Sequence, residues 1–177
     1  MADNEGASPR EQIVEACRRD NVELFQEVLG GMSGQPAEKI ADFFNTTTDV
    51  MGNYLLHVCA TYGSYDVMDE LLNIEYLECD PFTRRDKETP IHTAVRYATE
   101  RDIEIGTAMA KMLVDAGGDP RTKDKHGRTP AQMCDPKTSE LRSWLISQEY
   151  ILREGLKQET QETDGDDGPT GSASDSE

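Results

Sequence analysis

The sequence lacks the features that mark membrane-spanning, secreted or metal-binding proteins. No apolar stretch in its 177 residues approaches the length that spans a bilayer. Residues 1–9 lack the basic start and the apolar stretch of a secretory signal. The four cysteines form no Cys-x-x-Cys pair, so neither a disulfide framework nor a metal site is expected. We therefore expect a chain that works in the cytosol, or also in the nucleus, without a cofactor.

Basic residues are scarce. The chain has 18 Lys and Arg against 35 Asp and Glu, a formal net charge of −17. Such a charge repels nucleic acid and anionic membrane surfaces, and we expect neither nucleic-acid binding nor membrane insertion. A partner attracted by the overall field of the protein would be basic.

Motifs of catalysis are also missing. The sequence has no Gly-rich phosphate loop, no nucleophile elbow and no zinc-binding helix motif. Its length allows one hydrophobic core and some unstructured sequence. We therefore expect a protein that is not an enzyme.

What the sequence does contain is a repeat. Residues 53–60 (Asn-Tyr-Leu-Leu-His-Val-Cys-Ala) align with residues 88–95 (Glu-Thr-Pro-Ile-His-Thr-Ala-Val). A third stretch, 128–134, repeats the Thr-Pro and then diverges. The offsets of 35 and 40 residues fit helical repeat units with short insertions.

These stretches resemble the ankyrin-repeat family. The closest match to its Thr-Pro-Leu-His-x-Ala hallmark is Thr89–Ala94. The resemblance implies an all-α solenoid of about four helix-turn-helix units with β-turn fingers. Within the family the chain looks similar to small acidic fungal proteins of unassigned activity, through the stretch His92–Tyr97 and an acidic tail.

The domain limits follow from the repeat. We expect a flexible N-terminus, an ankyrin-repeat domain that ends in a separate capping helix, and a disordered acidic tail; these span residues 1–10, 11–157 and 158–177. The four units are expected at about residues 11–31, 49–81, 84–120 and 124–148. Residues 36–44 should add a short helix, and residues 98–105 should lengthen the link between the helices of the third unit.

The third unit departs from the family's turn, which opens with Asp and closes with Gly. The second and fourth units have these residues at Asp49 and Gly52 and at Asp124 and Gly127. The third unit has Arg84 and Lys87 there, so we expect its finger to adopt a different shape.

Two histidines, His57 and His92, occupy the same position in successive units. They are the obvious candidates for catalysis. The resemblance implies a structural role instead, in which each ring bonds the backbone of an adjoining turn. Repetition alone places them there, and we predict that both are structural.

The resemblance also implies where a partner would bind: on the fingers and on exposed positions of the first helices. These positions are Arg18, Arg19, Val50, Met51, Asn53, Thr61, Tyr62, Arg85, Asp86, Glu88, Arg96, Tyr97, Lys125, His126 and Arg128. Six of them are Lys or Arg and two are acidic, which predicts a basic groove on an acidic body. In the alternative interpretation the arginines neutralise nearby carboxylates and Tyr62 and Tyr97 pack between units.

Three functions remain open at this point. The first is an adaptor or scaffold, monomeric before binding, whose groove holds an acidic or mixed-charge segment of a protein partner. The second is a dedicated chaperone or assembly factor that shields a basic client such as a ribosomal protein. In the third, the acidic tail lies in the groove and competes with partners.

The tail has two interpretations of its own. It can act only as a solubilising segment. Alternatively, Ser172 and Ser174 each have an acidic residue three positions later, a pattern that acidophilic kinases accept. Phosphorylation there would add roughly −2 of charge per site.

Overall fold

The computed structural model describes residues 6–162, with side chains through residue 156. Over these residues it contains helices and no β-strand, so the all-α fold predicted from the sequence is confirmed. The helices are α1 (Pro9–Arg19), α2 (Val22–Gly30), α3 (Ala37–Thr46), α4 (Leu55–Tyr62), α5 (Tyr65–Leu72), α6 (Pro90–Glu100), α7 (Ile103–Asp115), α8 (Pro130–Met133), the 3-10 helix η1 (Pro136–Thr138) and α9 (Ser139–Glu162). The predicted phosphorylation sites Ser172 and Ser174 lie outside the described residues.

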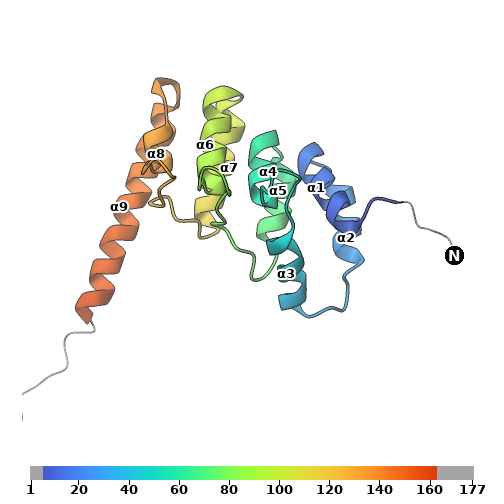
Figure 1. The fold of residues 1–177 in the computed structure, drawn as a ribbon. Helices are drawn as coiled ribbons and strands as arrows, with labels where there is room; N and C mark the ends of the chain where they lie inside the picture. The colour runs from blue at the N-terminus through green and yellow to red at the C-terminus, as the bar shows by residue number, and fades with distance from the viewer. Residues whose placement is uncertain (1–5, 163–177) are drawn as a thin grey trace, which may run out of the picture.

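The helices stand side by side as pairs, as Figure 1 shows, and their contacts place them in two rows. In the inner row, α1 packs on α4, α4 on α6 and α6 on α8. In the outer row, α2 packs on α5 and α5 on α7, and α9 packs on α8 at the C-terminal end. Each pair is too small to bury its own apolar face, so the core is shared between neighbouring pairs. The stacked helix pairs of an ankyrin solenoid are therefore present.

Local signals start and stop these helices. Ser8 caps α1, with the Glu11 carboxylate accepting the Ser8 N–H at 2.7 Å. Thr89 precedes α6 and Pro90 is its first residue, where a missing N–H costs nothing. Gly63 ends α4 with a φ of 73°, a left-handed backbone that suits glycine.

The predicted extra helix between the first two units is present as α3. Phe44 of α3 is buried and its ring centroid lies 5.6 Å from that of Phe25 in α2. The Arg10 guanidinium of α1 lies 5.1 Å from the centroid of the Phe43 ring. The insertion is thus anchored on the first unit by aromatic packing and a cation–π contact.

The prediction for residues 98–105 is wrong. These residues do not lengthen a link: α6 continues through Glu100 and α7 begins at Ile103, so only two residues connect them. The Asp102 carboxylate caps α7 by accepting the Ile105 N–H at 2.9 Å. The insertion therefore extends both helices of the third unit.

The C-terminal end differs from the predicted arrangement in one respect. A fourth-unit helix and a separate capping helix were expected, but α9 is one continuous helix of 24 residues. It includes residues 158–162, which were assigned to the disordered tail. No proline interrupts this stretch, and its residues are mostly good helix formers, so nothing in it stops the helix.

Helices α6 and α7 approach each other closely at Gly106 of α7. A Cβ atom at this position would lie 2.4 Å from the backbone nitrogen of Ala98 in α6. Real Cβ atoms do not approach backbone so closely, so the two helices can adopt this spacing only because residue 106 is glycine.

We predict that Gly106→Ala lowers the free energy of unfolding by about 1–3 kcal/mol, because α6 and α7 must move apart. Gly155→Ala is the matched control: the same change is made in α9, where no atom lies within 4 Å of the added Cβ. It should raise stability by about 0.5–1 kcal/mol through helix propensity. Urea denaturation measures both, and equal effects at the two positions would contradict the close packing.

Candidate interaction surface

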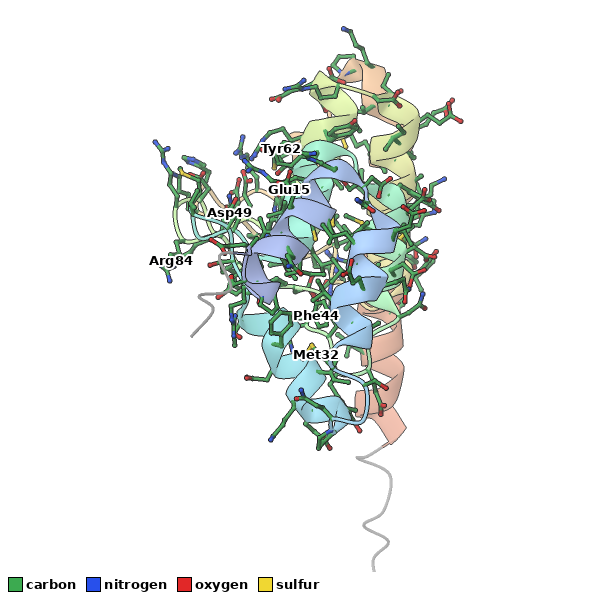
Figure 2. The ribbon with its side chains drawn as sticks, turned by 90° about the vertical axis from the view of Figure 1, so that its right-hand side faces the viewer. Glu15, Met32, Phe44, Asp49, Tyr62 and Arg84 are labelled. Atoms are coloured by element: carbon green, nitrogen blue, oxygen red, sulfur yellow. The ribbon has the colours of Figure 1, made fainter. Side chains whose placement is uncertain are left out.

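Three finger turns project from the starts of α4, α6 and α8. We name them the first finger (residues 49–53), the second finger (83–88) and the third finger (124–128). In Figure 2, Asp49 and Arg84 mark the side of the molecule on which the fingers project. In the first unit, formed by α1 and α2, residues 6–8 form no such turn before α1.

The first and third fingers have the same internal bonding. The Asp49 carboxylate accepts the N–H groups of Met51 at 2.8 Å and Asn53 at 2.9 Å. The Asp124 carboxylate accepts those of His126 at 2.8 Å and Arg128 at 2.9 Å. Such Asp side chains hold the turn by satisfying its backbone donors.

The glycine of each of these turns is left-handed, with a φ of 81° at Gly52 and 76° at Gly127. In the second finger Lys87 takes this conformation, with a φ of 51°. The expected difference in shape of this finger is also present, because it is one residue longer. Its opening residue is Thr83, whose N–H donates to the Glu88 carbonyl at 3.0 Å, and Arg84 is the extra residue.

The two predicted structural histidines each bond the finger of the next unit. His57 Nε2 lies 2.8 Å from the carbonyl oxygen of Glu88, and His92 Nε2 lies 3.0 Å from that of Arg128. A carbonyl only accepts, so each Nε2 carries the proton and donates. Both rings are buried. Each imidazole therefore joins one unit to the base of the following finger.

The other ring nitrogens differ. His92 Nδ1 accepts the Thr89 N–H at 3.1 Å, which completes a cap at the start of α6. Tyr54 occupies the position of this threonine in the second unit, and His57 Nδ1 is buried without a partner. In the fourth unit Gln132 takes the place of histidine, and its Oε1 accepts the Thr129 N–H at 2.9 Å.

Burial sets the protonation state of these histidines. Loss of hydration lowers the pKa of His57 to about 4 and also lowers the pKa of His92, because the charged ring is disfavoured away from water. Both rings are therefore neutral at physiological pH, as the bonds through a single N–H require.

On the inner helices, Tyr62 of α4 is the predicted residue best placed to meet a partner. Its side chain is 48% exposed. The Arg18 guanidinium of α1 lies 5.3 Å from the ring centroid and donates to the hydroxyl at 3.0 Å. The contact holds both side chains in place and leaves the other ring face and edge accessible.

The other predicted inner-helix residues have partners within the stack. Tyr97 is half-buried: a Cβ at Gly63 would lie 2.2 Å from its hydroxyl oxygen, so this tyrosine packs over the end of α4. Arg19 pairs with Glu15 on the same helix. Thr61 donates to the His57 carbonyl at 2.7 Å. For these residues the geometry agrees with the alternative interpretation, in which the arginines neutralise nearby carboxylates and the tyrosine packs between units.

Glu88 was predicted to face a partner, and this prediction is wrong because its side chain is buried. It is only 5% exposed and forms an ion pair with Arg96. The residue directly precedes α6 at the base of the second finger, where the bond from His57 holds its backbone inward.

The finger tips are exposed. Val50 is 98% exposed and Met51 is 74% exposed at the tip of the first finger. Asn53 donates to the Asp49 carboxylate at 3.1 Å and so belongs to the turn itself. His126 is exposed at the tip of the third finger.

The second and third fingers are joined to each other. The Lys125 N–H donates to the Asp86 carbonyl at 2.9 Å, and the Lys125 ammonium pairs with the Asp86 carboxylate. Arg128 pairs with Asp124 at 2.8 Å within the third finger. All three acids of these fingers are thus already paired with a cation, since Glu88 pairs with Arg96.

Cations without an ion pair in the described residues remain beside these pairs. They are Arg84, Arg85, Lys87 and Lys123, and all four are exposed. Only Arg85 was among the predicted partner-binding residues. For Arg84 and Lys87 the signal was present in the run Arg-Arg-Asp-Lys at 84–87, in which these two residues mark the departure from the family's turn.

Acidic side chains gather on the outer row instead. The exposed acids of α2, α5 and the segment that follows are Glu23, Glu27, Asp66, Asp69, Glu75 and Glu78. The charge of the protein is thus divided, with free cations on the fingers and acids on the outer helices. Such a division orients a charged partner during its approach.

Other chemistry has little support in the part of the chain that the structure describes. No three His, Cys, Asp or Glu side chains there are grouped to hold a metal ion. Burial raises the pKa of the thiols of Cys59, Cys79 and Cys134, which opposes thiolate formation. Among these residues no helix is long and apolar enough to span a bilayer.

Comparison with known proteins defines the family. No family model matches the chain. It is 38% identical over 130 residues to the ankyrin repeat-containing protein YGL242C of Saccharomyces cerevisiae, covering 73% of this chain and 71% of the yeast protein. It is 29% identical over 106 residues to zinc finger CCCH domain-containing protein 56 of Arabidopsis thaliana, of which it spans 14%.

A stack of helix pairs with projecting fingers defines an ankyrin-type repeat protein. The chain belongs to the ankyrin-repeat family, and the likeness to a fungal member is confirmed. Proteins of this family are in general interaction modules without catalytic activity, which supports a protein partner for this chain.

The histidine bonds predict how stability depends on pH. Because the folded-state pKa of His57 is about 4 and the unfolded value is about 6.5, the unfolded chain gains a proton first as the pH falls. Stability should therefore drop below pH 6.5, by about 2 kcal/mol between pH 7 and 5 from His57 alone.

His57→Gln removes this titration while keeping an amide N–H that can donate to Glu88. We expect the variant to lose less stability between pH 7 and 5 than the unmodified protein, as measured by urea denaturation at each pH. Lys39→Gln, on the exposed surface of α3, is the control. An unchanged pH dependence in His57→Gln would contradict a neutral, buried imidazole.

Proposed function

We propose that the protein is a non-catalytic interaction module that holds an acidic segment of a partner protein along its three fingers and inner helices. The observation that carries this proposal is the set of exposed cations without an ion pair on the second finger (Arg84, Arg85 and Lys87) and directly before the third (Lys123). They stand out in a chain with a net charge of −17. Repulsion of an acidic partner by the body of the protein is outweighed only where such cations are close to it.

The exposed aromatic at Tyr62 supports the same surface. Its hydroxyl and ring are fixed by Arg18, so little side-chain freedom is lost when a partner contacts it. Tyrosine and arginine are enriched among the residues that dominate binding energy. An interface of about 800 Å² per partner is the usual size for a specific complex.

A second function is favoured by the outer row. Exposed acids on α2 and α5 could attract a basic client, as a chaperone or assembly factor would require, and the acidic tail would add to this attraction. In that case the outer helices would carry the binding energy and the fingers would not.

Two charge variants separate these functions. The finger variant is Arg84→Ser/Arg85→Ser/Lys87→Ser, and the outer variant is Glu27→Gln/Asp69→Asn/Glu75→Gln, with three charges removed in each. The full chain and both variants are used to capture proteins by affinity purification at low and high salt, and quantitative mass spectrometry measures the amount of each captured protein. We expect the proteins that bind the full chain to be absent from the finger variant and to bind the outer variant. The opposite pattern would reject the finger surface and support binding of a basic client.

For a partner identified in this way, we predict that Tyr62→Ala weakens binding about 30-fold, or ~2 kcal/mol. Tyr65→Ala is the control, because Tyr65 is a 39% exposed tyrosine of the outer row. Isothermal titration calorimetry on the full chain measures both. Equal affinities for Tyr62→Ala and the unmodified protein would remove the inner helices from the contact surface.

A further inference from the structure

A cleft lies between α1 and the first finger. Its volume is about 270 Å³, and its walls include Val14 and Glu15 of α1 and Asp49 and Val50 of the finger. Figure 2 shows Glu15 and Asp49 near each other on these two elements, with Tyr62 above them. Of its lining, Arg18 and Val50 were predicted to bind a partner, whereas Val14 was not.

The cleft differs from the spaces between the other fingers, which are filled. Between the second and third fingers the space is closed by the bonds between Lys125 and Asp86. Between the first and second it is closed by the Arg84 side chain, whose Cδ would lie 3.3 Å from a Cβ at Gly52. On the other side of the first finger, residues 6–8 form no such turn before α1, and among the described residues the space beside Val14 is open.

The first finger places apolar residues beside this cleft without a structural need for them. Asp49 and Gly52 make the turn, and the two tip positions between them hold Val50 and Met51. The third finger has the same turn with Lys125 and His126 at these positions. Exposed apolar side chains at the tip are therefore not required by the fold, and apolar surface next to a cleft is typical of a binding site.

The size and lining of the cleft limit what fits. Its volume lies below the usual range of about 300–1,000 Å³ for small-molecule sites. Its charged rim holds both signs, with Arg10 and Arg18 against Glu11, Glu15 and Asp49. A single large apolar side chain, such as leucine or phenylalanine, would contact Val14 and Val50 in this cleft. A run of acidic residues would be attracted more strongly to the unpaired cations of the fingers than to this mixed-charge rim.

We propose that the partner segment has two parts: one large apolar residue that binds in this cleft, and an acidic run that binds the second and third fingers. Neighbouring helices of a stack lie about 8–10 Å apart, so the two parts are separated by one or two units. An extended chain covers about 3.3 Å per residue, which sets a spacing of about three to six residues. This inference rests on the proposed function and adds the sequence pattern of the partner.

The experiment uses a random 16-residue peptide library displayed on phage and panned on the immobilised full chain. Three variants are panned in parallel: Val50→Asp/Met51→Asp, the finger variant, and Ile103→Asp. Ile103 is a 47% exposed apolar residue at the start of α7 and serves as the matched control. Because Val50 and Met51 are also exposed, their replacement should leave the urea midpoint unchanged.

We expect the full chain and Ile103→Asp to select peptides with an apolar residue and an acidic run at the stated spacing. Val50→Asp/Met51→Asp should select acidic peptides without the apolar residue, and the finger variant should select apolar peptides without the acidic run. For a selected peptide made synthetically, exchange of its apolar residue for serine should weaken binding at least tenfold to the full chain and less than twofold to Val50→Asp/Met51→Asp.

The results distinguish the two proposals. If the full chain selects acidic peptides with no apolar preference, the cleft is not an anchor site and the inference fails, while the proposed function stands. If no peptide is enriched over the finger variant, both fail. If an apolar preference persists in Val50→Asp/Met51→Asp, the anchor lies elsewhere and the inference is overturned.

Discussion

The structure depends on one repeated interaction, the donation of a buried imidazole N–H to a backbone carbonyl of the next unit. His57 bonds the second finger at Glu88 and His92 bonds the third finger at Arg128. A helix pair without these bonds would still bury apolar surface, but the base of the finger would lose its buried bond to the preceding unit. The neutral state of both rings, kept by burial, allows the bond to persist without a counter-ion. The geometry of the candidate interaction surface follows from this.

The candidate interaction surface has fingers held in place by hydrogen bonds and a charge that differs in sign from that of the outer helices. Asp86 and Asp124 are used inside the fingers, so the cations around them are left to face solvent. The acids of α2 and α5 lie on the outer row, where they keep a strongly charged protein soluble without meeting the fingers. A partner segment would therefore experience the local sign of the fingers at short range rather than the net charge of the chain.

Much of the fold could be predicted from the sequence, because the Thr-Pro and His positions recur and each recurrence has a structural reason. The length of α9 could not, since no local signal distinguishes one long helix from two short ones that follow each other. The role of Thr83 was also hidden, because one added residue shifts the turn by a position that a simple alignment does not reveal. Tyr62 and Tyr97 look equivalent in sequence, and only the close approach of Tyr97 to Gly63 separates them. The cleft is lined by α1 and by the first finger, about 35 residues apart in the chain, and such a space is visible only in three dimensions.

The bonds between the second and third fingers have a consequence for the kinetics of association. Lys125 and Asp86 join the second and third fingers into one surface, here called the ledge. The conformational entropy that two separate loops would lose on binding has therefore already been lost during folding. A segment that reaches the ledge meets donors already in position, so its capture needs no slow rearrangement of the protein. The first finger has no such backbone tie to its neighbours among the described residues. A partner segment would therefore meet one surface made of two joined fingers and a second made of a single finger.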